Sequence, residues 1–101
     1  MTKYKITKSE DSYKIEVTGH AMSGPYGYDI VCASISTAVA MTASLIDKLG
    51  FSCNIRTLVH EEGKFIIETD ISKDEVVKVM DNLVDYLDTI SQQYPKNIKK
   101  S

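Results

Sequence analysis

The sequence is 101 residues long and 43% hydrophobic, which is enough apolar material for one domain with one core. Its formal net charge of -2 argues against direct nucleic-acid binding, because nucleic-acid-binding domains normally carry a strong excess of basic residues. The first residues lack the apolar segment of a signal peptide, and there are only two cysteines, so we expect a cytoplasmic protein without a disulfide.

Residues 3–9 and 12–18 alternate between apolar and polar side chains, which is typical of half-buried β-strands. The apolar members of the two segments are Tyr4, Ile6, Tyr13, Ile15 and Val17. Glu10 and Asp11 separate the segments and predict a hairpin turn. The second strand is expected to end at Gly19 and His20, where a glycine-containing loop begins.

Residues 30–46 carry no charge and predict a long apolar helix. The segment has the minimum length for a membrane span, but its several Ser and Thr residues favour burial in protein, so we expect no membrane insertion. Asp29 is the expected N-cap, and Gly50 is expected to stop the helix after Leu49. The expected core-facing residues are Val31, Ile35, Ala38, Thr42, Leu45 and Leu49. The rest of the surface has small side chains that would let another helix or a second subunit approach closely, at Ala33, Ala40, Ala43 and Ser44.

The second half of the chain repeats this layout. Two alternating segments flank a turn at residues 61–63 and predict a second hairpin. The expected faces of its strands are formed by Ile55, Thr57 and Val59 and by Phe65, Ile67 and Thr69. Ser72 and Glu75 form a capping box that predicts a helix ending near Tyr94. Its expected core face consists of Val76, Met80, Leu83, Leu87 and Ile90, and its acidic side faces water.

The order hairpin, helix, hairpin, helix predicts a two-layer α+β domain, an antiparallel sheet with both helices on one face. We expect this domain to span residues 1–94. Residues 95–101 have three lysines and are expected to form a short, solvated, basic C-terminal tail.

His20 and Cys32 are the candidate catalytic pair. With Asp29 as N-cap, Cys32 occupies the first turn of the helix, where the helix dipole favours a thiolate and free backbone amides can bind an oxyanion. Eleven residues separate His20 from Cys32, and His20 belongs to a separate element, from which an imidazole can reach the sulfur. From the residues alone, a catalytic role and a purely structural role are equally open. A cysteine in an apolar helix also serves as a small core residue, and a histidine at a strand end also serves as a surface residue.

A longer pattern surrounds this pair. Gly19-His20-Ala21, Tyr26-Gly27, Asp29-Ile30-Val31-Cys32-Ala33 and Ser36 resemble the signature of the ribosomal-processing cysteine protease family (Prp). The spacing from histidine to cysteine also agrees, and the likeness in length and element order covers nearly the whole chain. The loop at residues 22–25 departs from the family pattern, and its Pro25 stiffens a segment expected to move when substrate enters.

The resemblance implies an endopeptidase that removes an N-terminal extension from the precursor of large-subunit ribosomal protein 27 during ribosome assembly. It implies a homodimer, a Cys–His dyad and no cofactor, with Cys32 as the nucleophile, His20 as the base and an aromatic residue just before the cut. Asp29 and Ser36 match further positions of the signature. Asp29 either tunes the charge of the site or only caps the helix, and Ser36 either bonds within the site or back-bonds to the carbonyl of Cys32. The expected substrate loop contains Gly19, Ala21, Gly24, Tyr26 and Gly27.

The sequence argues against two other kinds of site and leaves one alternative function open. A phosphate-binding loop is excluded because no Gly-Lys-Ser/Thr follows the glycines, and no metal site is expected because no close Cys-x-x-Cys pair exists. His60 is expected to be an exposed hairpin residue, and Cys53 a core residue. The alternative to the peptidase is a non-catalytic ribosome-assembly module that binds a basic ribosomal protein through the loop and the acidic helix.

Overall fold

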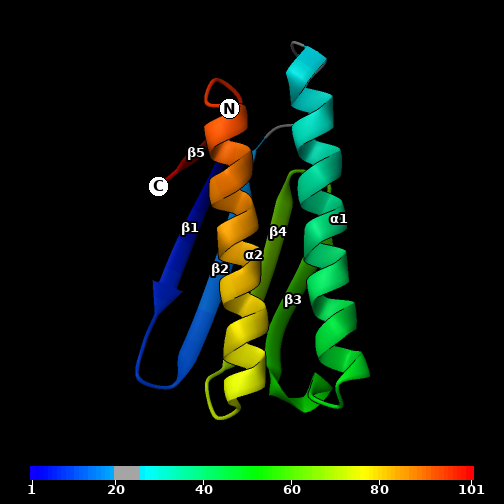
Figure 1. Cartoon of the computed structure of the whole chain (residues 1–101), viewed down its shortest axis with the longest axis vertical. Helices are drawn as coiled ribbons and strands as arrows, with labels where there is room; N and C mark the ends of the chain where they lie inside the picture. Colours follow the sequence, from blue (N-terminus) through cyan, green and yellow to red (C-terminus); the bar gives the residue numbers. More distant parts are fainter. Residues whose placement is uncertain (20–25) are drawn as a thin grey trace.

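Two β-hairpins and two long helices form the domain (Figure 1). The computed structural model describes residues 1–19 and 26–101, and the side chains of residues 26–29 fall outside this description. In chain order the elements are β1 (Thr2–Lys8), β2 (Ser12–Thr18), α1 (Tyr26–Lys48), a 3-10 turn (Ser52–Asn54), β3 (Ile55–Glu61), β4 (Lys64–Asp70), α2 (Asp74–Gln93) and β5 (Ile98–Lys100). The predicted order of hairpin, helix, hairpin, helix is therefore confirmed.

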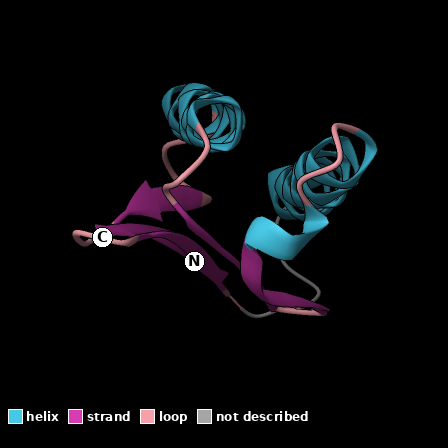
Figure 2. Cartoon of the chain, turned by 90° about the horizontal axis from the view of Figure 1, so that it is seen from below, coloured by secondary structure: helices cyan, strands magenta, loops and turns pink. Residues whose placement is uncertain are grey.

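The five strands form one sheet in the order β3-β4-β2-β1-β5. All neighbouring pairs are antiparallel except β1 and β5, which are parallel. The two hairpins meet through β2 and β4, whose register places Ile15 opposite Ile67. Both helices lie on the same face of the sheet, as seen along the helix axes in Figure 2. The predicted two-layer α+β architecture is confirmed, with one strand more than the sequence indicated.

That additional strand is β5, which lies in the segment expected to be a solvated tail. Ile98 is only 1% exposed, and the amide of Thr2 donates to the carbonyl oxygen of Asn97 at 2.9 Å. The expectation of a solvated terminus is wrong for residues 98–100, because one apolar residue between lysines is enough to anchor an edge strand over the core. The chain end is thus part of the sheet.

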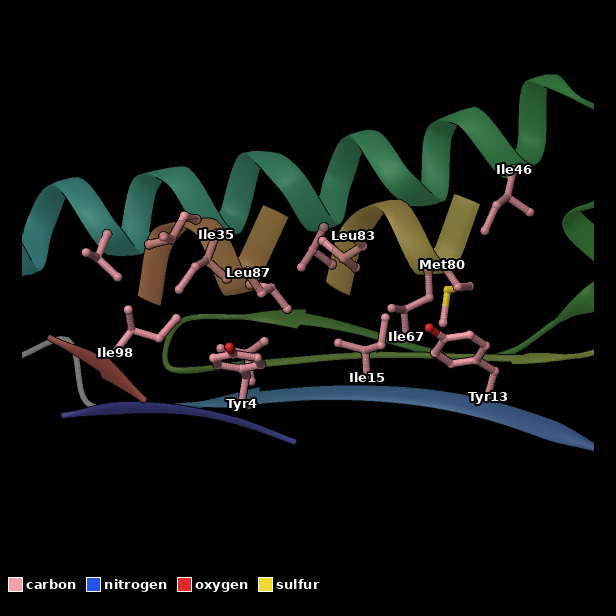
Figure 3. Packing of buried hydrophobic residues seen from close by; sticks show 14 of the residues in the cluster. Tyr4, Tyr13, Ile15, Ile35, Ile46, Ile67, Met80, Leu83, Leu87 and Ile98 are labelled. Carbon is pink, nitrogen blue, oxygen red and sulfur yellow. The ribbon is translucent and has the colours of Figure 1, made fainter. Parts of the chain in front are cut away.

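The core lies between the sheet and the helices (Figure 3). All five core positions expected on α2 are buried. On α1, Val39 and Ile46 are buried, whereas Leu45 and Leu49 are 46% and 48% exposed. The expected α1 stripe repeats every 3.5 residues, and a straight helix of 3.6 residues per turn drifts away from such a repeat. The prediction is therefore right at the start of α1 and wrong at its end.

Strand β3 contains an irregularity that changes the face of its side chains. Ile55 pairs with Thr69, but Thr57 pairs with Glu68, so the register shifts between them. A bulge of this kind adds one residue to a strand and re-aims the side chains that follow. Ile55 consequently faces the helices while Thr57 and Val59 face away, and the expectation that the three share a face is wrong. The bulge also turns His60 toward the helix layer.

Neither helix begins with the cap expected from the sequence. Helix α1 begins at Tyr26, so Asp29 lies inside it and is not its N-cap. Helix α2 begins at Asp74 with Lys73 at the N-cap position and no side-chain capping bond. The hydroxyl of Ser72 donates instead to Asp70 at 2.8 Å, which withdraws it from the expected capping box.

Among the described residues, one helical segment, Ile30–Lys48, is long and apolar enough to cross a membrane by length and hydropathy. A core helix passes the same test, and in this segment Val31, Ile35, Val39 and Ile46 are buried in the domain core. The remaining side of α1 exposes further apolar side chains, of which Met41 is 67% exposed.

Candidate active site

A pocket of about 350 Å³ lies between the N-terminal half of α1 and the end of the sheet where β2 stops and β3 turns into β4. Cys32 and Ser36 line it from α1, Val17 from β2 and Phe65 from β4. The remaining lining residues are Thr2, Thr18, Gly19, Ala33, Ile35, His60, Glu61, Glu62 and Gly63. Cys32 is half-buried, so its thiol belongs to an accessible pocket wall rather than to the closed core. The pocket thus combines a mostly apolar lining with an accessible cysteine and two glutamates.

Gly19 fixes the point at which the chain leaves β2 toward His20. Its amide donates to the carbonyl oxygen of Gly63 at 3.0 Å, across to the turn of the second hairpin. A Cβ atom on Gly19 would lie 2.9 Å from the Cα of Thr2, and one on Gly63 would lie 2.5 Å from the carbonyl oxygen of Gly19. Gly63 also has a φ of +78°, which favours glycine. Because these two positions have no side chains, the start of β1, the end of β2 and the turn between β3 and β4 can meet beside the pocket.

Several expected site residues cannot be placed. His20, Ala21 and Gly24 lie outside the described residues. Tyr26 and Gly27 were expected in the substrate loop, but they form the first turn of α1, so the loop is shorter than expected. Asp29 follows them in the helix, and its side chain is outside the description.

The longer helix also corrects the expected environment of Cys32. With Tyr26 as the first helical residue, Cys32 lies in the second turn rather than the first. Only the first four amides of a helix lack an intrahelical partner, so the amide of Cys32 is not free to bind an oxyanion. The hydrogen-bond donors for such an oxyanion have to come from other groups around the pocket.

Ser36 and His60 form a contact that the sequence did not predict. The Ser36 hydroxyl lies 3.1 Å from Nε2 of His60, and the same nitrogen lies 3.2 Å from the carbonyl oxygen of Ser36. The His60 ring also packs at a tilt on Phe65, with 5.1 Å between ring centroids. His60 is exposed, as expected, but it faces the pocket because of the β3 bulge. The sequence gives no sign of this contact, because the alternation of apolar and polar residues in β3 does not reveal where a bulge exchanges the two faces of the strand.

The second cysteine is remote from this site. Cys53 lies in the 3-10 turn that follows the C-terminal end of α1, whereas Cys32 lies near the start of that helix (Figure 1). Both thiols are free, and Cys53 is exposed, so the expectation that it belongs to the core is wrong. No group of three metal-ligating side chains is found within residues 1–19 and 30–101.

Comparison with known proteins identifies the family. Residues 1–99 match the family model of the cysteine protease Prp. The ribosomal processing cysteine protease Prp of Staphylococcus aureus strain Mu50 is 31% identical over 84 residues, covering 80% of this chain and 77% of that protein. The crystal structure of an essential ribosomal processing protease Prp from S. aureus, in complex with a substrate peptide, aligns with a TM-score of 0.79 at 26% identity, over 100% of this chain and 98% of that one.

A second crystal structure, of a Streptococcus mutans protein, aligns with a TM-score of 0.78 at 22% identity, over 100% of this chain and 92% of that one, and supports the fold alone. The family model, the S. aureus relative and the cysteine-walled pocket agree, and the chain belongs to the cysteine protease Prp family.

Proposed function

We propose that this protein is an endopeptidase in which Cys32 is the nucleophile and His20 the general base, and that its substrate is the precursor of large-subunit ribosomal protein 27. The observation that carries the proposal is that Cys32 and Gly19, the residue directly before His20, line the same pocket. The printed name of the S. aureus relative supports a ribosomal substrate.

The proposed reaction has two steps. His20 takes the proton of the Cys32 thiol, the sulfur attacks the scissile carbonyl carbon, and a tetrahedral oxyanion forms. The C–N bond then breaks as the imidazolium of His20 gives its proton to the leaving amine, which leaves an acyl group on Cys32. Water, deprotonated by His20, attacks this thioester, and the acid fragment is released with the thiol regenerated. No cofactor enters these steps.

The acidic side of α2 supports a basic substrate. Asp74, Glu75, Asp81 and Asp85 are exposed on this helix, while the whole chain has a net charge of only -2. Ribosomal proteins are generally basic, and a surface of opposite charge accelerates their encounter with the enzyme at low ionic strength. We place the reaction in the cytosol, where ribosomes assemble.

The proposal also includes a homodimer, as the resemblance implies. Its best support is a groove of about 610 Å³ between α1 and α2, on the side of the helices away from the core. Met41, Leu45 and Tyr86 line this groove and are 67%, 46% and 42% exposed. Apolar side chains gathered in this way are typical of an interface between protein chains.

The test is incubation of the purified protein with the precursor of ribosomal protein 27, followed by mass measurement of both products. The wild-type protein and Cys53→Ala should release the N-terminal extension, and Cys32→Ala should release none. His20→Ala should lower kcat more than it raises KM, because the base acts on the transition state.

Iodoacetamide provides a second readout. At mildly acidic pH, Cys32 should be alkylated much faster than Cys53 although Cys53 is the more exposed thiol. Binding of the precursor without cleavage, together with equally slow alkylation of both thiols, would instead indicate a non-catalytic assembly module.

A further inference from the structure

We propose that His60 is a positioning residue of this site, which directs the hydroxyl proton of Ser36 toward Cys32 and so provides a hydrogen-bond donor during peptide hydrolysis. The inference deepens the proposed function and rests on it. Its starting point is the pair of contacts that one nitrogen of His60 makes with Ser36.

The contact with the carbonyl decides which nitrogen of His60 carries a proton. A carbonyl oxygen only accepts hydrogen bonds, so we assign a hydrogen to Nε2, which then donates to the Ser36 carbonyl oxygen at 3.2 Å. The same N–H is then shared with the Ser36 hydroxyl oxygen, 3.1 Å away, which becomes a second acceptor. Because this hydroxyl accepts from His60, its own proton remains available for another partner.

Helix geometry indicates where that proton can go. Ser36 lies four residues after Cys32 on α1, and residues at this spacing lie above one another on the same helix face. Helical side chains lean toward the N-terminus of the helix, so the Ser36 side chain leans toward the turn that holds Cys32. Both residues line the pocket. A donor at this position can bond to the thiolate sulfur or to the oxyanion that forms beside it.

The backbone amide of Cys32 itself does not provide such a donor. Cys32 lies in the second turn of α1, where backbone amides already bond to carbonyl oxygens of the preceding turn. The Ser36 hydroxyl, held by His60, is a side-chain donor on the same wall of the pocket. His60 itself acts only through Ser36, and the tilted packing on Phe65 fixes the plane of its ring.

The proposal is tested with two substitutions at His60 and one at Ser36. His60→Phe keeps a ring that can pack on Phe65 but removes the N–H, and Ser36→Ala removes the hydroxyl. Each should lower kcat roughly 10- to 100-fold with little change in KM, as expected for the loss of one donor to a charged group. His60→Gln retains an N–H donor and should keep more activity than His60→Phe.

A double-mutant cycle separates this role from independent contributions. If His60 acts through the Ser36 hydroxyl, the double variant should be no less active than Ser36→Ala alone. Leu58→Ala is the matched control, because Leu58 lies on the same face of β3 and is 49% exposed but does not line the pocket. Its kcat should stay within about twofold of wild type, as usual for surface substitutions away from a site.

Nitrogen-15 NMR of the imidazole rings gives a readout without activity. His60 should carry its proton on Nε2, and its signals should shift in Ser36→Ala. A His60→Phe variant with wild-type kcat, losses that multiply in the double variant, or a proton on Nδ1 would each overturn the inference while leaving Cys32 catalysis intact. A wild-type protein that cleaves no precursor would contradict the proposed function, and with it the catalytic role of this pair.

Discussion

The phenol of Tyr13 on β2 donates a hydrogen bond of 2.7 Å to the carboxylate of Asp81 on α2, although the two residues lie 68 positions apart. One strand over and two helical turns along, Tyr4 on β1 donates to Asp88 at 2.5 Å. A lysine lies over each ring, Lys8 at 4.6 Å from the centroid of Tyr13 and Lys100 at 5.9 Å from that of Tyr4. These two clusters attach α2 to the sheet on the side away from the pocket.

The clusters predict a loss of stability at high pH. Burial, and secondly the hydrogen bond to Asp88, raise the pKa of Tyr4 to about 12 from its usual value of 10.0. The folded state therefore favours the neutral phenol, which contributes to the free energy of unfolding. This stabilisation is fully present below pH 10 and is lost as the pH rises from 10 to about 12. Between pH 8 and pH 11, Tyr4→Phe should lose less unfolding free energy than wild type in denaturant titrations.

At pH 8, Tyr4→Phe should itself cost about 0.5–1.5 kcal/mol, as is usual for one hydrogen bond. Tyr94→Phe is the control, because Tyr94 directly follows α2 and does not line the groove of the proposed dimer. Identical losses between pH 8 and pH 11 in wild type and Tyr4→Phe would contradict the assignment.

Gly19→Ala should damage both stability and activity. The added methyl group would meet the backbone of Thr2 at 2.9 Å, so β1 and β2 would have to separate at the pocket. Overpacking of this kind costs about 1–3 kcal/mol. Thermal unfolding should show a lower Tm, and kcat should fall because the attachment point of His20 shifts.

Gly50→Ala is the matched control for this substitution. Gly50, unlike Gly19, has a positive φ, of +89°, and its Cβ would meet no atom within 4 Å among the described residues. It should lose stability through its backbone conformation alone and keep its kcat. A Gly19→Ala protein with wild-type kcat would show that this junction does not position the proposed catalytic pair.

Charge in the groove between the helices should separate the subunits of the proposed dimer. Met41 is the most exposed of the three apolar side chains named above for this groove, and Met41→Glu replaces it with a carboxylate. The groove also contains Asp85, so the substitution adds to its negative charge. Light scattering should change from twice the 11.3 kDa of one chain to a single chain. Lys5→Glu, on the opposite face of the sheet, is the control and should remain a dimer. Dimers in both variants would place the interface elsewhere.

The sequence predicts the fold well where amphipathic patterns are unambiguous. On α2, acidic residues alternate with apolar ones and define one face, so every expected core position is buried. On α1 the long uncharged run provides no polar face to fix the helical phase, and Leu45 is exposed where Ile46 is buried. Helix periodicity predicts a helix here but does not determine its rotation.

The candidate site is less predictable, because it depends on long-range placement. The family signature leads to Cys32 and Ser36, and both line the pocket. His60 comes from a strand whose faces are exchanged by the bulge after Ile55, and no local pattern indicates that bulge. The sequence also does not predict that α1 begins at Tyr26. Asp29 is a favoured N-cap residue, and it therefore suggests a later start for the helix.

The most direct test of the account is to quench the reaction with acid during turnover and to locate the acyl group by peptide mass spectrometry. Trypsin separates the two thiols, since Cys32 lies in the peptide of residues 15–48 and Cys53 in that of residues 49–56. We predict that the peptide of residues 15–48 gains the mass of the acyl fragment, and that the gain disappears in Cys32→Ala. An acyl group on Cys53, or undiminished precursor cleavage by Cys32→Ala, would contradict the account.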